Sequence, residues 1–334
     1  MSKIRLVQYE RGLAETWDTF IQDSVNGTLF HRQKFIGYHP AGRFEDCSLL
    51  FYDGNELLAV FPGALVQTEN EKVLKSHPGT SYGGFVFAKK VSLKKMFETL
   101  ECLHAFCREK SVVRIEFRSS ERFFYQTALD QVEFALVHQG YERKEQELST
   151  FFQLNDFEYH ADFEKFLMQF PQKNRNEIRK GFKEGLCLRK LETVKERASF
   201  HKILSESLRE RYNRAPSHTF AEMEKILELF PEECFVMGIL KNDTLASGFL
   251  VMKLNRMGWH IFYAPVNYAY QSWRPLNYGA ARLIQFAMEN NARHLNYGVS
   301  TPGGHSVNWG LLQFKENFNG TGAIRTYWVK HLTE

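Results

Sequence analysis

The second half of this 334-residue sequence contains an ordered set of predicted elements, and this order constrains the fold more than any other feature. Apolar runs bounded by turn residues predict strands, while apolar residues at helical spacing predict helices. The expected elements are helices over 198–212 and 220–229, strands over 235–240, 246–254 and 259–264, a helix over 276–290, a strand over 294–297, a helix around Lys315 and a strand over 324–329. This order predicts a mixed α/β (α+β) fold.

The first half predicts a weaker copy of the same order. Its expected elements are a strand over 4–8, a helix around Trp17, strands over 47–52 and 57–66 joined at Asp53-Gly54, a strand over 85–87, a helix over 93–110, a strand over 112–117, a short helix before Gly140 and a strand ending near Leu154. The chain is also too long for one ordinary core. We therefore predict two lobes, 1–155 and 156–334, with an interlobe cleft.

Charge and composition exclude some classes of function. The chain has 43 Lys plus Arg against 39 Asp plus Glu, a net charge of +4. A dedicated nucleic-acid binder should have one strongly basic face, so we expect no DNA partner, although a local basic groove for phosphates remains compatible. Aromatic residues make up 15% of the chain, including 30 Phe, which predicts aromatic cores and an aromatic-lined cleft.

The cysteines and the N-terminal segment indicate a reducing compartment. The five cysteines have no zinc-ligand spacing, so we expect free thiols and no metal site. The basic N-terminal residues are not followed by an apolar segment, and no run approaches the roughly 18 apolar residues of a membrane span. These features predict a cytoplasmic protein with at most peripheral contact to a membrane.

One lysine stands in an aromatic segment near the C-terminus. The sequence reads Asn296-Tyr-Gly-Val-Ser-Thr301, then a glycine-rich bend, and Lys315 follows between Phe314 and Phe318. A cation on an apolar helical face costs free energy unless it has a use. A positioned cation can stabilise the oxyanion of acyl transfer. The alternative is a surface lysine whose stem lies over apolar neighbours.

A second segment predicts an anion site. In Gln271-Ser-Trp-Arg-Pro-Leu-Asn-Tyr-Gly-Ala280, an arginine and small residues precede a helix. Free N–H groups and the helix dipole favour anions at such a place. The alternative is that Arg274-Pro275 simply begins the helix, where proline is common.

Other charged and titratable residues indicate a function less specifically. A basic helical stretch over 163–185 carries Arg175, Arg179 and Lys183 on one face, either as a solvated stripe or as an electrostatic rim for a phosphate-rich substrate. A histidine could accept the proton of an attacking amine, and the candidates are His31, His39 and His305. No serine stands in a Gly-x-Ser-x-Gly elbow, so a hydrolase triad has no anchor.

The element order is similar to that of the GNAT (N-acetyltransferase) fold, and several segments resemble the Fem-type (FemAB-like) peptidyltransferases and their tandem-GNAT relatives of polysaccharide and cell-envelope biosynthesis. The matching segments run in the expected order across nearly the whole chain. They begin at Trp17, Asn26, Ser81, Asn176, Tyr212 and Asn296 and end at Gly320. The long helical arm of some peptidyltransferases has no room in this chain, which favours acyl-CoA as the donor.

The resemblance implies a role for particular residues. Lys315 and Phe314 lie at the acyl-transfer centre, while Lys34 and Arg211 hold the phosphates of a nucleotide-linked acceptor. Two further residues belong to the acceptor side, Arg214 as an alternative to Arg211 and His39 from a matched segment. The residues Arg274, Asn277, Gly279 and Ala280 resemble the R-x-x-G-x-G/A loop that holds the CoA pyrophosphate, with Asn277 in place of the usual glycine.

These implications define the expected function. We expect an acyltransferase that moves an acetyl or similar group from acyl-CoA onto an amine of a nucleotide- or lipid-linked sugar or peptide precursor of the cell envelope. One alternative is an aminoacyl-tRNA-dependent peptidyltransferase of the same fold. The other is a lobe pair that binds such a precursor without catalysis.

Overall fold

The computed structural model describes residues 4–68 and 71–332 and divides the chain into two compact units. Unit 1 consists of Met1–Leu148, Gly303–His305 and Ile324–Glu334, and unit 2 of Ser149–Pro302 and Ser306–Ala323. Both contain helices and strands, so the fold is mixed α/β. The last strand, β15 (Thr321–His331), begins in unit 2 and ends in unit 1. None of the helices within the described ranges is long and apolar enough to cross a membrane.

Unit 2 is built on a sheet whose central strands follow the predicted order. The strands are β10 (Cys187–Lys190), β11 (Cys234–Lys241), β12 (Thr244–Asn255), β13 (Gly258–Tyr263) and β14 (His294–Val299). Neighbours pair in this order, and only β13 and β14 pair in parallel. Parallel neighbours require a crossover connection, which α9 (Pro275–Glu289) provides. The end of β9 (Glu142–Gln153) pairs antiparallel with β14.

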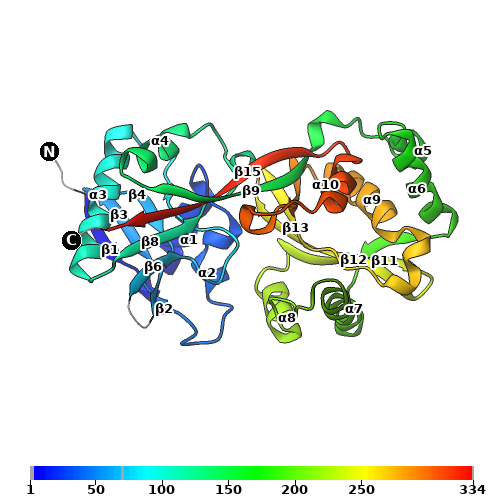
Figure 1. Cartoon of the computed structure of the whole chain (residues 1–334), viewed down its shortest axis with the longest axis horizontal. Coiled ribbons are helices and arrows are strands. Elements are labelled where there is room, and N and C mark those ends of the chain that lie inside the picture. The colour runs from blue at the N-terminus through cyan, green and yellow to red at the C-terminus, as the bar shows by residue number, and fades with distance from the viewer. Residues whose placement is uncertain (1–3, 69–70, 333–334) are drawn as a thin grey trace. The chain divides into compact units, whose positions relative to one another are not determined.

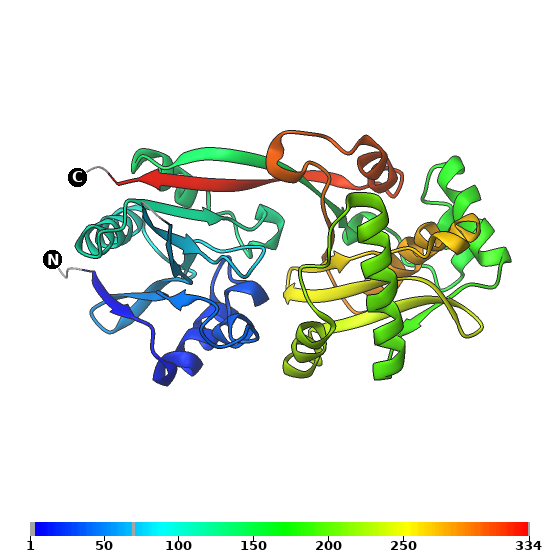
Figure 2. The same cartoon turned by 60° about the horizontal axis from the view of Figure 1, so that its bottom comes forward.

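Helices cover both faces of this sheet (Figures 1 and 2). A Cβ on Gly248 of β12 would meet the ring of Phe200 on α7 (Val194–Tyr212) at 2.9 Å. The next residue, Phe249, lies 3.0 Å from the place that a Cβ on Gly279 of α9 would occupy. Successive side chains of a strand point to opposite faces, so α7 and α9 cover opposite faces. The helix α8 (Phe220–Leu229) packs on β11, and α6 (Gln172–Lys183) packs on α9.

The structure divides the predicted helical stretch 163–185 in two. The first helix, α5, spans Phe163–Leu167, and α6 begins after Pro171. Proline has no N–H to donate and clashes with the preceding turn, so the helix cannot continue through it. The break places Phe163, Phe166 and Phe170 in the aromatic core of unit 2, where Phe318 after α10 (Trp309–Glu316) also packs.

Unit 1 contains a second set of strands and one long helix. One sheet has the order β1 (Arg5–Gln8), β3 (Leu49–Asp53), β4 (Glu56–Phe61) and β7 (Val86–Phe87). A parallel pair, β6 (Lys72–Ser76) and β8 (Arg114–Arg118), is joined through α3 (Leu93–Glu109). The remaining elements of this unit are α1 (Ala14–Asp23), α2 (Gln33–Ile36), β2 (Glu45–Asp46), β5 (Ala64–Gln67) and α4 (Asp130–His138).

Two details of unit 1 differ from the sequence prediction. The strand expected over 57–66 is divided at Pro62-Gly63 into β4 and β5, which belong to different sheets. The close approach of Gly63 to its neighbours explains the bend, because a Cβ there would lie 2.7 Å from the Cys47 carbonyl oxygen. The strand β6 was not predicted, since Lys72-Val-Leu-Lys-Ser76 is short and only partly apolar.

Candidate active site

Lys315 lies on α10, and its side chain is completely buried. The helix begins at Asn308, whose side-chain oxygen accepts a hydrogen bond from the Leu311 N–H at 3.1 Å. Lys315 Nζ donates hydrogen bonds to the carbonyl oxygens of Gly298 (2.6 Å) and Val299 (3.1 Å) at the end of β14. Its exposed fraction is 0%, which excludes the alternative of a surface lysine.

Burial changes the charge of this lysine. The pKa of Lys315 falls from 10.5 to about 7 because its ammonium group loses hydration inside the protein. Among the residues that the structure describes, none forms an ion pair with it; its two polar partners are main-chain carbonyls. Near neutral pH the neutral and charged forms therefore coexist. Lys315 can gain or lose a positive charge in response to a nearby negative charge.

A pocket of about 410 Å³ lies where β13 and β14 stop pairing. The parallel register ends at His260 and Asn296, although the strands continue to Tyr263 and Val299. The pocket is lined by residues of the unpaired strand ends and of the helices α7 and α10. These lining residues include Leu208, Ile261, Phe262, Tyr297, Leu311 and Phe314. The pocket walls are thus largely apolar, with a few tyrosine hydroxyls and Arg211 as polar groups, as is usual for sites that bind small ligands.

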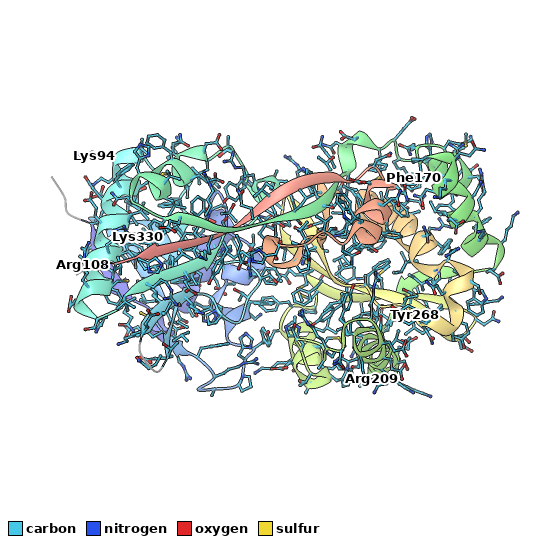
Figure 3. The ribbon with its side chains drawn as sticks, viewed as in Figure 1. Lys94, Arg108, Phe170, Arg209, Tyr268 and Lys330 are labelled. Carbon is cyan, nitrogen blue, oxygen red and sulfur yellow. The ribbon has the colours of Figure 1, made fainter. Side chains whose placement is uncertain are left out.

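The N-terminus of α9 also reaches this pocket. Leu276, in the first turn of the helix, belongs to the lining. Arg274 precedes the helix in a left-handed conformation (φ 56°), and no side chain caps this end. Pro275 has no N–H, so the first-turn amides of Leu276 and Asn277 remain as donors at the positive end of the helix dipole. In Figure 3 the labelled Tyr268, which also lines the pocket, marks the segment before this helix.

The four residues predicted for the donor loop have different surroundings. Arg274 forms an ion pair with Glu177 of α6 at 2.5 Å, and Asn277 donates a hydrogen bond to the side chain of Asn174 at 3.4 Å. Gly279 and Ala280 face the sheet instead. A Cβ on Gly279 would lie 2.2 Å from Cδ1 of Ile239, so glycine is needed there for packing of α9. Ala280 is 1% exposed and belongs to the core of unit 2.

The predicted acceptor residues are divided between the units. Arg211 lies at the end of α7, lines the pocket and places its guanidinium 5.3 Å from the centre of the Tyr212 ring. Arg214 follows two residues after the helix and is exposed. Lys34 and His39 belong to unit 1, Lys34 on α2 and His39 with its Nε2 2.9 Å from the Gly79 carbonyl oxygen. The structure therefore brings Arg211, Phe314 and the Lys315 helix to one pocket.

The histidines have mostly local roles. His31 is buried and bonded through Nδ1 to Thr28 Oγ1 at 2.8 Å, and burial lowers its pKa to about 4. His305 is exposed. Within residues 4–68 and 71–332, no group of three His, Cys, Asp or Glu residues could hold a metal ion. The five cysteines are free thiols.

The predicted basic stripe is partly used inside the protein. Arg179 forms an ion pair with Glu164 of α5 at 2.8 Å, and Arg175 donates a hydrogen bond to the Phe170 carbonyl oxygen at 3.0 Å. The first contact connects α6 to α5, and the second connects α6 to the segment between the two helices. They account for part of the charge pattern that was interpreted as a solvated face or a phosphate rim.

Sequence reasoning missed the tyrosines of the pocket. Tyr263 lines it and bonds to His218 Nδ1 at 2.9 Å, and Tyr297 lines it from the next strand. In the sequence both stand at the ends of strands like other core aromatics. The only available signal was their position at the carboxyl ends of the predicted strands 259–264 and 294–297, where ligands of open α/β sheets commonly bind.

Comparisons with known proteins identify the fold but no family. No family model matches the sequence, and no curated protein matches it. Solved structures match over nearly the whole chain. The crystal structure of FemX has a TM-score of 0.72 at 12% identity, covering 98% of this chain and 97% of FemX. A tandem GNAT protein from the clavulanic acid biosynthesis pathway has a TM-score of 0.58 at 7% identity, covering 99% of both chains. The fold is the tandem GNAT fold.

A third similar structure extends the range of proteins with this fold. The C-terminal domain of a putative lysylphosphatidylglycerol synthetase from Agrobacterium fabrum has a TM-score of 0.59 at 13% identity, covering 97% of this chain and 91% of that one. The predicted tandem GNAT and Fem-like fold is thereby confirmed. At these identities the similarity establishes the fold, so the site must carry any argument about chemistry.

Proposed function

We propose that this protein is an N-acyltransferase whose donor, an acyl-CoA, binds in the pocket of unit 2. The observation that carries the proposal is the opening between β13 and β14, because it joins an apolar pocket to the uncapped start of α9. An acyl-pantetheine arm requires an apolar channel, while its pyrophosphate requires an anion site. Helix N-termini supply such sites through free N–H groups and the helix dipole.

The proposed reaction is direct transfer in a complex with both substrates. The amine nitrogen of the acceptor attacks the acyl carbonyl carbon, whose oxygen takes up the electron pair and becomes negative. The carbon–sulfur bond then breaks, CoA leaves as a thiolate, and the amine proton passes to a basic group of the acceptor or to solvent. Lys315 stabilises the oxyanion in its charged form, and Phe314, which lines the pocket, positions the acyl group.

For the acceptor, we propose an amine of a nucleotide- or lipid-linked sugar or peptide precursor of the cell envelope, modified in the cytoplasm. Arg211 supports a phosphate-bearing acceptor, since it lines the pocket and a guanidinium can form paired hydrogen bonds to phosphate. Lys34, His39 and Arg214 are proposed as further acceptor contacts. The name of the lysylphosphatidylglycerol synthetase relative is compatible with a lipid-linked acceptor.

Labelled donors test this proposal directly. Acyl-CoA and aminoacyl-tRNA, each carrying a labelled acyl group, are incubated separately with the protein and a panel of nucleotide- and lipid-linked amino sugars. We expect label to move from acyl-CoA only. Leu311→Trp should abolish acyl-CoA binding measured by calorimetry, because the larger ring fills the pocket. Trp309→Ala, at a residue of the same helix that is 72% exposed, serves as the control and should bind normally.

Two other results would favour the alternatives. Transfer from aminoacyl-tRNA alone would favour a Fem-type peptidyltransferase. Binding of an acceptor with no affinity for either donor would favour a module that binds a precursor without catalysis.

A further inference from the structure

Tyr297 is one of several polar residues in the wall of the unit 2 pocket. It stands on β14, one residue before the Gly298 carbonyl that binds Lys315. The ring packs edge-on against Phe314 (5.8 Å between ring centres) and Phe249 (6.2 Å), and the side chain is only 8% exposed. These contacts would suit a phenylalanine equally well. The hydroxyl therefore needs an explanation of its own.

The hydroxyl of Tyr297 is buried and has no hydrogen-bond partner among the described residues. Other tyrosine hydroxyls within the described ranges are bonded. The half-buried Tyr327 donates to Glu116 at 2.6 Å, and the buried Tyr141 has its hydroxyl 3.1 Å from His104 Nε2. A buried hydroxyl without a partner costs free energy of folding. Unpartnered buried groups of this kind are most readily explained where a ligand supplies the missing acceptor.

The position and the protonation state make this hydroxyl suitable as a donor to a ligand. Burial raises the pKa of Tyr297, so its O–H stays protonated at neutral pH. Lys315 Nζ lies 5.9 Å from the centre of the Tyr297 ring. Of these two hydrogen-bond donors, Tyr297 lines the pocket, whose walls are mostly apolar. A carbonyl oxygen of a ligand in the pocket is an atom that could accept from the Tyr297 hydroxyl.

We propose that Tyr297 is a catalytic residue that donates a hydrogen bond to the acyl carbonyl oxygen of the bound donor. This inference rests on the proposed acyl transfer. Tyr297 keeps its proton throughout: the bond from the amine nitrogen to the carbonyl carbon forms, the bond to the leaving group breaks, and the oxygen carries negative charge only between these events. The hydrogen bond strengthens as that charge develops, so it lowers the barrier.

The variant Tyr297→Phe removes the hydroxyl oxygen and leaves the ring contacts in place. We expect kcat to fall roughly 100-fold, the usual effect of losing one oxyanion donor, and KM for acyl-CoA to rise by no more than about 5- to 10-fold, the worth of one ground-state hydrogen bond. The melting temperature should stay the same or rise, because the variant no longer buries an unpartnered hydroxyl. The matched control is Tyr327→Phe, which loses its bond to Glu116 in unit 1. That variant should be less stable and fully active.

A binding measurement separates this inference from the proposed function. The probes are a ketone analogue of acetyl-CoA, which keeps the carbonyl but cannot transfer it, and CoA itself. Tyr297→Phe should bind the ketone about 5- to 10-fold more weakly than the wild type, in the range of one hydrogen bond, and bind CoA equally well. If the wild type binds and uses acyl-CoA and Tyr297→Phe does both equally well, the role of Tyr297 is overturned and the proposed function is not. A wild type that neither binds nor uses acyl-CoA would overturn the proposed donor and this inference with it.

Discussion

The parallel strand pairs of the two units differ in whether the strands separate. In unit 1, β6 and β8 pair from Val73 to Ser76, the end of β6. In unit 2, β13 and β14 stop pairing at His260, three residues before the end of β13. A cavity of about 20 Å³ is lined by residues around Phe117 of β8, whereas the unit 2 pocket measures about 410 Å³. Both pairs are connected through a helix, so the crossover alone does not make a site.

Local contacts explain the difference. After β6 the chain turns back, and the Gly83 N–H donates a hydrogen bond to the Arg118 carbonyl oxygen. Gly84, in a left-handed conformation (φ 86°), lies so close to Phe117 that a Cβ would be 2.5 Å from its ring. This segment occupies the space beside β8. The helix α3, which connects β6 and β8, is also capped, because the Ser92 side chain accepts a hydrogen bond from the Lys95 N–H. The corresponding helix of unit 2, α9, has no such cap. Only unit 2 combines an open strand pair with an uncapped helix within the described residues.

The largest expected effect is the loss of turnover in the variant Lys315→Met. If the unit 2 site performs acyl transfer, kcat should fall about 100- to 1,000-fold, because methionine has a similar length but cannot stabilise an oxyanion. Stability at pH 7 should not fall, since the variant no longer buries an ionisable group. Turnover is measured with labelled acyl-CoA and folding by circular dichroism.

The control comes from the parallel pair of unit 1. Lys75 of β6 forms an ion pair with Glu116 at 3.1 Å and is partly exposed. Lys75→Met should leave turnover unchanged. Equal losses from both substitutions would break the comparison, because they would place chemistry in both units.

The pH dependence of stability should come from unit 2. The unfolded chain holds the Lys315 proton up to a pKa near 10.5, while the folded chain releases it near pH 7. Between these values the unfolded state binds more protons, so the free energy of unfolding rises with pH across this window. Lys315→Met should remove this rise in urea titrations at pH 7 and pH 10. A rise that persists in the variant would show that another group causes it.

The smallest expected effect concerns packing of α9. Gly279→Ala should lower the free energy of unfolding by about 1–3 kcal/mol, since its Cβ would overlap Ile239 and force a shift. Gly12→Ala, where no atom lies within 4 Å of the added Cβ, should change stability little. Urea unfolding measures both. If Gly279→Ala instead keeps full stability but loses CoA affinity, this glycine belongs to the donor loop rather than to the packing of the helix.

Periodicity predicted the elements well where the chain is regular. The three meandering strands and the helix after them agree with β11, β12, β13 and α9 to within a few residues. The errors occurred where one residue overrides a pattern. Pro171 interrupts the helix expected over 163–185, so that α5 ends at Leu167 and α6 begins after the proline. Gly63 bends a strand whose apolar run does not stop. The short strand β6 exists because β8 and β5 pair with it, and pairing partners are not visible in a local pattern.

The candidate site was predictable only in part. The aromatic surroundings of Lys315 and the helix start after Arg274 indicated charge chemistry, but the alternatives for both stayed open. Gly279 was assigned to a phosphate loop, whereas its contacts place it against Ile239. Tyr297 was not considered at all, since a strand tyrosine followed by glycine has no local signature of a ligand site.

The sequence by itself determined the order of helices and strands and the presence of one lysine among aromatics, because both are properties of neighbouring residues. Tertiary structure decided whether that lysine is buried, since its exposure depends on Gly298 and Val299, about 16 residues away along the chain. It also decided where β13 and β14 separate and which hydroxyl remains without a partner. Burial and hydrogen bonding between distant segments set these outcomes, and they shift the pKa of Lys315 toward neutrality.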